Sequence, residues 1–221
     1  MKKNNLMIIA IIAIIALAGM TFYALSRGDD NTMMDSSEMS GAIENSSVMA
    51  NTNSPTYKEF SQLKGEDYDR LFLSNMIAHH QGAVDMAKLA LTNAKHQELK
   101  DMANDIVTAQ TSEISDMKSW QQEWGYPAIS GEMMMDHSAM GMMADVGQMT
   151  ESLKGLSGDA FDKQFITSMI EHHQSAIDMA VSGKTNAYHT EVITLTQNIV
   201  TAQSKEISQL KQWQRDWDYS N

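Results

Sequence analysis

Residues 76–81 read Met-Ile-Ala-His-His-Gln, and residues 85–87 read Asp-Met-Ala. The pattern returns 93 positions later, where residues 169–174 read Met-Ile-Glu-His-His-Gln and residues 178–180 read Asp-Met-Ala. Four of the seven histidines of the 221-residue chain belong to these two copies. Each pair of histidines has a methionine on both sides, and imidazole with thioether is a ligand set for soft metal ions. The repeated stretch therefore indicates a duplicated unit with metal-binding chemistry.

Both copies have the periodicity of an amphipathic helix, in which positions spaced by four and three residues share one face. The first copy places on this face Phe72, Met76, His79, Ala83, Met86 and Ala90, and the second Phe165, Met169, His172, Ala176, Met179 and Gly183. His80 falls beside the face, among Leu73, Ile77 and Val84. These histidines are therefore predicted to lie away from the polar face of their helices.

Two interpretations follow, because a buried imidazole must be hydrogen-bonded or ligated. In the first, the two helices bind metal through Met76, His79, His80, Met86, Met169, His172, His173 and Met179. In the second, these residues are ordinary core methionines and core histidines whose hydrogen bonds are satisfied. The identical spacing of the two pairs, in a chain with 20 methionines, favours the first interpretation.

The overall composition narrows the classes of function. The net charge of −12 argues against binding to nucleic acid or to an anionic membrane surface, and it favours attraction of cations. The absence of cysteine excludes a disulfide framework and a thiolate metal site. The length allows one or two domains with a sizeable hydrophobic core.

The amino terminus predicts export. Residues 6–25 contain no charge and have about the length of a membrane-spanning helix. Lys2 and Lys3 would keep the amino end in the cytoplasm, so the rest of the chain lies outside it, in the periplasm or at the cell surface. A cleaved signal peptide is the alternative, with residues 16–18 (Ala-Leu-Ala) as the cleavage site. We favour an uncleaved anchor in the cytoplasmic membrane.

The duplication extends well beyond the histidines, because residues 66–126 align with residues 159–219 without a gap. In the first copy we expect helices over residues 68–91 and 96–124, and no segment has β-type alternation. Two such helical hairpins would close into an all-α, ferritin-like four-helix bundle. The predicted organisation is an anchor or signal peptide at 1–26, a disordered Met-containing spacer at 27–56, hairpin repeats at 57–126 and 159–221, and a Met-rich connector at 127–158.

A carboxylate stands on or beside the apolar face of the second helix in each repeat, at Glu113 and Glu206. A carboxylate in such a place needs a partner. The partner is a bound cation or an imidazole N–H from the first helix, as is usual around a metal-bound histidine. A carboxylate at the edge of the bundle that reaches water is the alternative.

The connector holds the densest group of soft ligands in the chain. Six methionines and one histidine occur within eleven residues, namely Met133, Met134, Met135, His137, Met140, Met142 and Met143. Glycine and serine would keep the segment flexible enough to wrap around an ion, and thioethers select Cu(I) or Ag(I) over zinc, iron or magnesium. A loop packed on the bundle, with methionine as filler, is the alternative.

The repeated pattern, with its later Gln-x-x-Glu-Ile and tryptophan-rich helix end, resembles the family catalogued as domain of unknown function 305. The resemblance covers about residues 66–219 and implies a ferritin-like helical bundle. The family includes an extracytoplasmic copper-binding protein. The positions that match its signature are Met76, His79, His80, Asp85, Met86, Met169, His172, His173, Asp178 and Met179.

The sequence therefore predicts an extracytoplasmic protein that buffers or transfers copper, Cu(I) in preference to Cu(II), for copper homeostasis or resistance. Its partners would be copper ions, a copper exporter or other copper carrier, and the membrane. One alternative is a ferritin-like di-iron oxidoreductase, which the absence of Glu-x-x-His from the first helix of each repeat disfavours. The other is a membrane-anchored helical adaptor that needs no metal. No nucleophile–base pair or phosphate-binding loop is visible, so we expect no enzymatic activity.

Overall fold

The computed structural model describes residues 49–126 and 137–219, which belong to one compact unit, Ser46–Asn221. Side chains of residues 137–144 lie outside this description. The described residues are helical apart from turns and one isolated bridge between Gly65 and Ala187, which confirms the all-α class. The predicted membrane helix at 6–25 lies outside the described residues. Of the helices within them, none has the length and apolar character needed to cross a bilayer.

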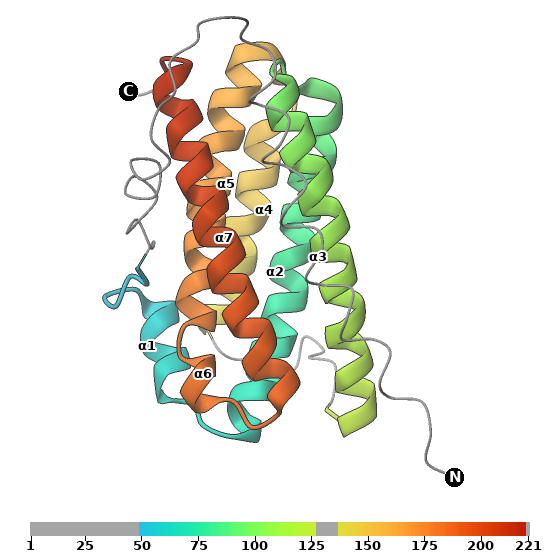
Figure 1. The fold of residues 1–221 in the computed structure, drawn as a ribbon, viewed down its shortest axis with the longest axis vertical. Coiled ribbons are helices and arrows are strands. Elements are labelled where there is room, and N and C mark those ends of the chain that lie inside the picture. The colour runs from blue at the N-terminus through green and yellow to red at the C-terminus, as the bar shows by residue number, and fades with distance from the viewer. Residues whose placement is uncertain (1–48, 127–136, 220–221) are drawn as a thin grey trace, which may run out of the picture. The chain divides into compact units, whose positions relative to one another are not determined.

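Four long helices form the bundle, and shorter ones cover parts of it (Figure 1). In chain order the helices are α1 (Pro55–Gln62), α2 (Glu66–Asn93), α3 (Gln97–Trp124), α4 (His137–Leu153), α5 (Gly158–Ala180), α6 (Gly183–Asn186) and α7 (Thr190–Asp216). The hairpins α2–α3 and α5–α7 are the two sequence repeats. Figure 1 shows the long helices side by side, with the short α1 and α6 at one end of the bundle.

Helices α2 and α5 join the two repeats and run antiparallel. At one end the Tyr68 hydroxyl of α2 donates to the carbonyl of Met179 near the end of α5, over 2.9 Å. At the other end the backbone N–H of Lys95, just after α2, donates to Asp162 in the first turns of α5, over 2.9 Å. The first half of α2 therefore faces the second half of α5, and the two His-His pairs meet midway.

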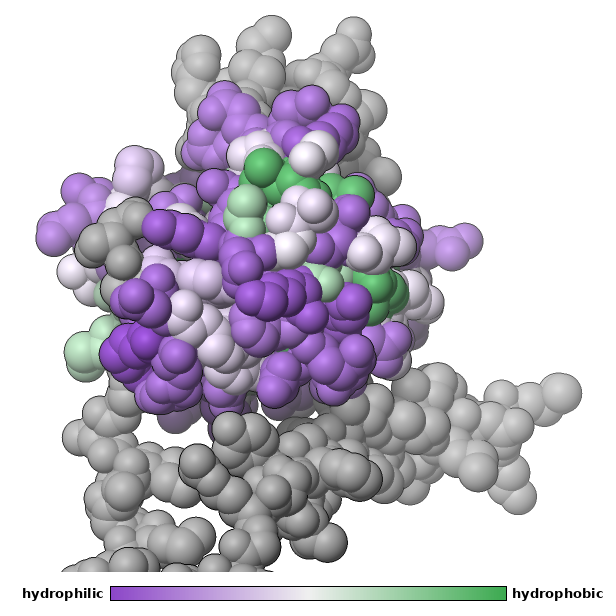
Figure 2. Space-filling view, turned by 90° about the horizontal axis from the view of Figure 1, so that it is seen from above, coloured by the Kyte–Doolittle hydropathy of each residue, from purple (hydrophilic) through white to green (hydrophobic). Residues whose placement is uncertain are grey.

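The core consists of two apolar clusters on either side of these histidines. One cluster includes Phe72 and Met76 from α2 with Met179 from α5. The other includes Met86 from α2 with Phe165 and Met169 from α5. Seen from above, the surface of the bundle is mainly hydrophilic, with small apolar areas (Figure 2). This is expected when the apolar faces of the helices are turned inward.

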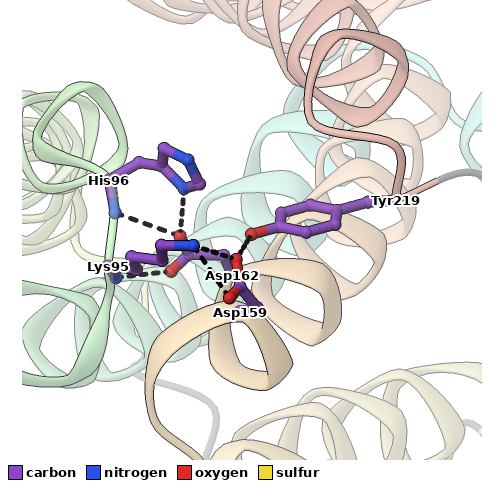
Figure 3. Close-up of polar contacts among 5 residues, drawn as sticks. All are labelled: Lys95, His96, Asp159, Asp162 and Tyr219. Atoms are coloured by element: carbon purple, nitrogen blue, oxygen red, sulfur yellow. Dashed lines mark hydrogen bonds and ion pairs between the residues drawn. The ribbon is translucent and has the colours of Figure 1, made fainter.

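At each end of the bundle an aspartate, a histidine and a tryptophan contact one another across the two repeats. We call each such group a repeat clamp. Buried Asp162 of α5 accepts hydrogen bonds from the backbone N–H groups of Lys95 and His96, and from Nδ1 of His96 over 2.6 Å (Figure 3). The His96 ring stacks on Trp217 at 3.8 Å between centroids. Because the aspartate belongs to one repeat and the histidine to the other, the clamp fixes the register between them.

The second repeat clamp has the same geometry with the repeats exchanged. Buried Asp69 of α2 accepts from the backbone N–H groups of Tyr188 and His189, and from Nδ1 of His189 over 2.8 Å. His189 stacks on Trp124 at 3.6 Å. The sequence alignment shows these residues as conserved between the repeats but predicts no role for them.

The connector and the spacer each contain ordered structure that the sequence analysis did not predict. The connector is not flexible throughout, because residues 137–153 form α4. Val146 and Leu153 of α4 are buried, and their helical spacing lets the segment pack on α2 and α5 despite its glycines. Residues 55 and 56, which the sequence analysis assigned to a disordered spacer, belong to α1, because Pro55 starts this helix and the Ser54 hydroxyl caps it by accepting from the N–H of Tyr57.

The repeat clamps predict a large effect of their aspartates on stability. We expect Asp162→Ala or Asp69→Ala to lower the free energy of unfolding by about 3 kcal/mol, because each removes a buried charged acceptor that three N–H groups share. Urea unfolding measures the change. The control is exposed Asp67→Ala in the first turn of α2, where a loss within about 0.5 kcal/mol is expected. Equal losses at Asp67 and Asp69 would contradict the role of the clamp.

Candidate metal centre

Midway along the bundle a set of polar side chains separates the two apolar clusters, and we call this set the polar layer. Its members are His79, His80, Gln110 and Glu113 from the first repeat and His172, His173, Gln203 and Glu206 from the second. All four imidazoles are at most 1% exposed. The helices therefore enclose the imidazoles that the sequence predicted to lie on inward faces.

The outer histidine of each pair lies against the predicted carboxylate. Nε2 of His80 donates to Oε2 of Glu113 over 2.8 Å. Nε2 of His173 lies equally close, 2.8 Å, to Oε2 of Glu206, but the angles there are not those of a hydrogen bond. The carboxylate side chains are 20% and 27% exposed, respectively. The sequence left open whether each glutamate contacts an imidazole or reaches water. In the structure each glutamate does both.

The inner histidines meet where the two repeats touch. The rings of His79 and His172 lie 3.7 Å apart between centroids. Nε2 of His172 donates to the backbone carbonyl of His79 over 3.0 Å. Nε2 of His79 lies 2.6 Å from the hydroxyl of Ser175, which itself donates to the carbonyl of His172. The hydroxyl oxygen is therefore the acceptor for an N–H at Nε2 of His79.

These contacts leave Nδ1 of each of the four histidines without a hydrogen-bond partner among the described residues. A neutral imidazole that donates from Nε2 has its lone pair on Nδ1. This applies to His79, His80 and His172. Nδ1 of all four histidines is buried, and no donor among the described residues reaches it. The polar layer therefore buries four nitrogen atoms at which a metal ion or other electron-pair acceptor could bind.

Gln110 and Gln203 add to the layer and were not predicted as site residues. Each lies one turn before its glutamate, is buried, and has a side-chain oxygen that no described donor reaches. A polar residue at the same inward position of both repeats is the sequence signal that could have identified them. Unpaired buried acceptors cost on the order of 1–3 kcal/mol each, so a ligand that paired with these atoms would stabilise the layer.

The donor chemistry fits a soft or borderline transition metal. Imidazole nitrogen suits copper, whereas only two carboxylates are near, and both contact imidazoles. Among the described residues, no three His, Asp or Glu side chains already surround a point where an ion would sit. Binding of one ion by several of these side chains would therefore require the side chains to move.

The predicted thioether ligands lie either in the apolar clusters or outside the described side chains. Met76, Met86, Met169 and Met179 are fully buried in the apolar clusters next to the layer, so their role as ligands stays a prediction. Met133, Met134 and Met135 lie outside the described residues. His137, Met140, Met142 and Met143 belong to α4, but their side chains are not described.

Burial controls the protonation of the inner histidines. Loss of solvation lowers the pKa of His79 well below its usual value, and repulsion from His172 lowers it further. Burial likewise lowers the pKa of His172, with His173 as the next cause. Both rings are therefore neutral at pH 7, which is the form that binds metal.

Comparison with known proteins identifies relatives of this structure. The family model described as Domain of unknown function (DUF305) matches residues 18–120 and 69–214. CopM in the Cu(I)-bound form is 39% identical over 67% of this chain and 96% of that chain, with a TM-score of 0.55. Its Cu(II)-bound form is 38% identical over 71% and 99%, with a TM-score of 0.58.

Two further relatives carry no stated function. A DUF305 fragment from Deinococcus radiodurans is 26% identical over 65% of this chain and 93% of that chain, with a TM-score of 0.55. An uncharacterized protein of Acanthamoeba polyphaga mimivirus is 37% identical over 51 residues, which are 23% of this chain. That match spans about a third of the viral protein, 34%.

The depressed pKa values of His79 and His172 predict acid destabilisation of the metal-free protein. In the unfolded chain a histidine takes up a proton below about pH 6.5, whereas these buried rings stay neutral. The unfolded state then binds more protons, so each histidine lowers stability by up to about 1.4 kcal/mol per pH unit below 6.5. Urea unfolding between pH 7.5 and 5.5 measures the slope. The variant His79→Gln with His172→Gln should have a shallower slope, and an unchanged slope would contradict the assignment.

Proposed function

The chain belongs to the DUF305 family, and on this basis we propose that it is an extracytoplasmic copper-binding protein that buffers Cu(I) and Cu(II) or passes them on. The observation that carries the proposal is the set of four buried Nδ1 atoms without a donor, two from each repeat. The similarity to CopM, of which copper-bound forms are known, supports the same metal.

The geometry of the polar layer gives each histidine a defined task. The carboxylate of Glu113 at Nε2 of His80 would orient this ring and increase the electron density at its Nδ1, as such partners do in other metal sites. Glu206 lies at the same distance, 2.8 Å, from Nε2 of His173. His79 and His172 bring the two repeats together, so an ion bound between them would contact both halves of the bundle. A bound copper ion would accept these lone pairs.

The methionine segment provides a second, softer set of ligands. Its residues 137–143 form the first turns of α4, and this helix packs against α2 beside the polar layer. Thioethers bind Cu(I) in preference to harder ions, so the segment would collect Cu(I) close to the imidazoles. We infer that the connector loads or unloads the histidine site.

The remaining features of the proposal rest on the sequence. The uncharged segment at 6–25 would anchor the protein in the cytoplasmic membrane, or direct its export if cleaved, and a copper exporter or other copper carrier would be the partner. We propose no catalytic role. A di-iron site is disfavoured because the layer offers two carboxylates rather than four, and both contact imidazoles.

The proposal predicts that His79→Ala with His172→Ala lowers the number of copper ions bound, while the helix content stays near that of the original protein. Cu(I) titration under reducing conditions and circular dichroism measure the two quantities. The matched control is His96→Ala with His189→Ala, which also removes two imidazoles but from the repeat clamps. That control should lose stability and keep its copper stoichiometry. Unchanged stoichiometry in the first variant would return the histidines to a purely structural role.

The connector is tested by replacing six of its seven methionines, Met133, Met134, Met135, Met140, Met142 and Met143, with leucine. Leucine keeps much of the apolar volume and removes the sulfur. We expect the variant to lose part of its Cu(I) and keep the fraction bound by histidine. The same exchange at Met102 and Met149, outside the proposed ligands, should change nothing. If the six-leucine variant binds as much Cu(I) as the original protein, the connector is packing material.

A further inference from the structure

A pocket of about 430 Å³ lies between α2 and α4. The residues that line it include His79, Gln81, Gly82 and Asp85 of α2 and Gly147 and Glu151 of α4. Among the described members of the polar layer, His79 is the one that reaches the pocket wall. Its Nδ1 is also one of the four buried nitrogens without a donor. The pocket therefore leads from the surface to one histidine of the proposed metal centre.

Gly82 brings α4 close to α2 beside the layer. A Cβ atom at this position would lie 2.0 Å from Cγ1 of Val146, so any larger residue would require Val146 to shift. The equivalent position of the second repeat is Ser175, whose hydroxyl contacts His79. The two repeats therefore differ at the point nearest to the inner histidines.

The corresponding place on α5 is closed by residues 49–54, which we call the N-terminal strap. The backbone N–H of Asn51 and the hydroxyl of Ser54 both donate to the carboxylate of Asp178, each over 2.7 Å. The side-chain amide of Gln174 donates to the carbonyl of Met49 over 3.1 Å. The same Gln–Asp pair in α5 thus holds a stretch of polypeptide on the surface of the second repeat.

In the first repeat the equivalent pair, Gln81 and Asp85, is exposed and lines the pocket. The amide of Gln81 donates to Asp85 over 3.0 Å, as Gln174 does to Asp178. Asp85 forms no ion pair with the described residues, whereas Glu151 is paired with Lys154. An unpaired carboxylate at the mouth, in a chain of net charge −12, favours the approach of cations.

We propose that the α2–α4 pocket is the port through which a soft monovalent cation, Cu(I), enters and leaves the polar layer, with His79 as the first imidazole it meets. The N-terminal strap keeps the equivalent path beside His172 closed, so exchange is one-sided although the site is built from two similar repeats. This inference rests on the proposed copper function but concerns access rather than affinity.

Gly147 allows the port to be obstructed without disturbing the fold. It lies on the pocket wall, is exposed, and a Cβ atom added there would meet no described atom within 4 Å. Gly147→Trp would therefore place an indole at the mouth. Gln148→Trp is the matched control, because the next residue of α4 is exposed and does not line the pocket. Circular dichroism and thermal unfolding establish that both variants keep the bundle.

The first measurement needs no metal. Diethyl pyrocarbonate acylates unprotonated imidazole, and peptide mass mapping gives the rate at each histidine of the metal-free protein. We expect His79 to react at least about tenfold faster than His80, His172 and His173, and Gly147→Trp to remove that difference. Gln148→Trp should leave it unchanged. Equal rates at His79 and His172 in the original protein would overturn the port.

The second measurement follows Cu(I) transfer from its bicinchoninate complex. Gly147→Trp should slow loading by at least about tenfold and leave the final stoichiometry unchanged, and Gln148→Trp should load at the original rate. Loading of Gly147→Trp at the original rate would refute the port while the copper function stands. If the original protein takes up no Cu(I), the copper function fails, and the acylation rates still decide whether the pocket gives access to His79.

Discussion

The polar layer depends on the contact between α2 and α5 at His79 and His172, where two imidazoles are buried with ring centroids 3.7 Å apart inside an apolar core. Such a contact is costly unless both rings stay neutral and keep hydrogen bonds. The backbone carbonyl of His79 and the hydroxyl of Ser175 provide these bonds, but only in one register of the two helices. A slip by one helical turn, about 5.4 Å, would separate the rings from their acceptors. The repeat clamps at both ends hold that register.

The repeated motif predicted much of this arrangement. The helices expected at 68–91 and 96–124 are found at Glu66–Asn93 and Gln97–Trp124, because their apolar spacing and their breaks are local signals. The inward placement of His79 and His172 follows from the same spacing. The pairing of Glu113 with His80 was one of the alternatives that the sequence left open. Helix α4 was missed, because its glycines weaken the local signal and its helical form depends on packing against α2 and α5.

The repeat clamps could not be predicted for a different reason. His96 and Asp162 are 66 positions apart and belong to different repeats. In a duplicated sequence each histidine has an equivalent aspartate in its own repeat as well, and the alignment does not say which one it contacts. Only the antiparallel packing of α2 and α5 decides that the contacts cross between repeats. The same holds for Gly82 and Ser175, whose difference matters only because α4 packs on one of them and His79 contacts the other.

The polar layer also links metal binding to the stability of the bundle. In the described structure the four Nδ1 atoms contribute unpaired acceptors to the interior, so the metal-free fold gives up stability that apolar residues would supply. An ion bound there would remove this loss of stability. At a free ion concentration of 100 times the dissociation constant, binding would add about 2.7 kcal/mol to the free energy of unfolding. Because the ligands come from both repeats, that stabilisation would act on the α2–α5 contact itself. Under the proposed copper function, binding of the ion would change the packing of the two halves, and the one-sided pocket at His79 would set how fast that packing responds.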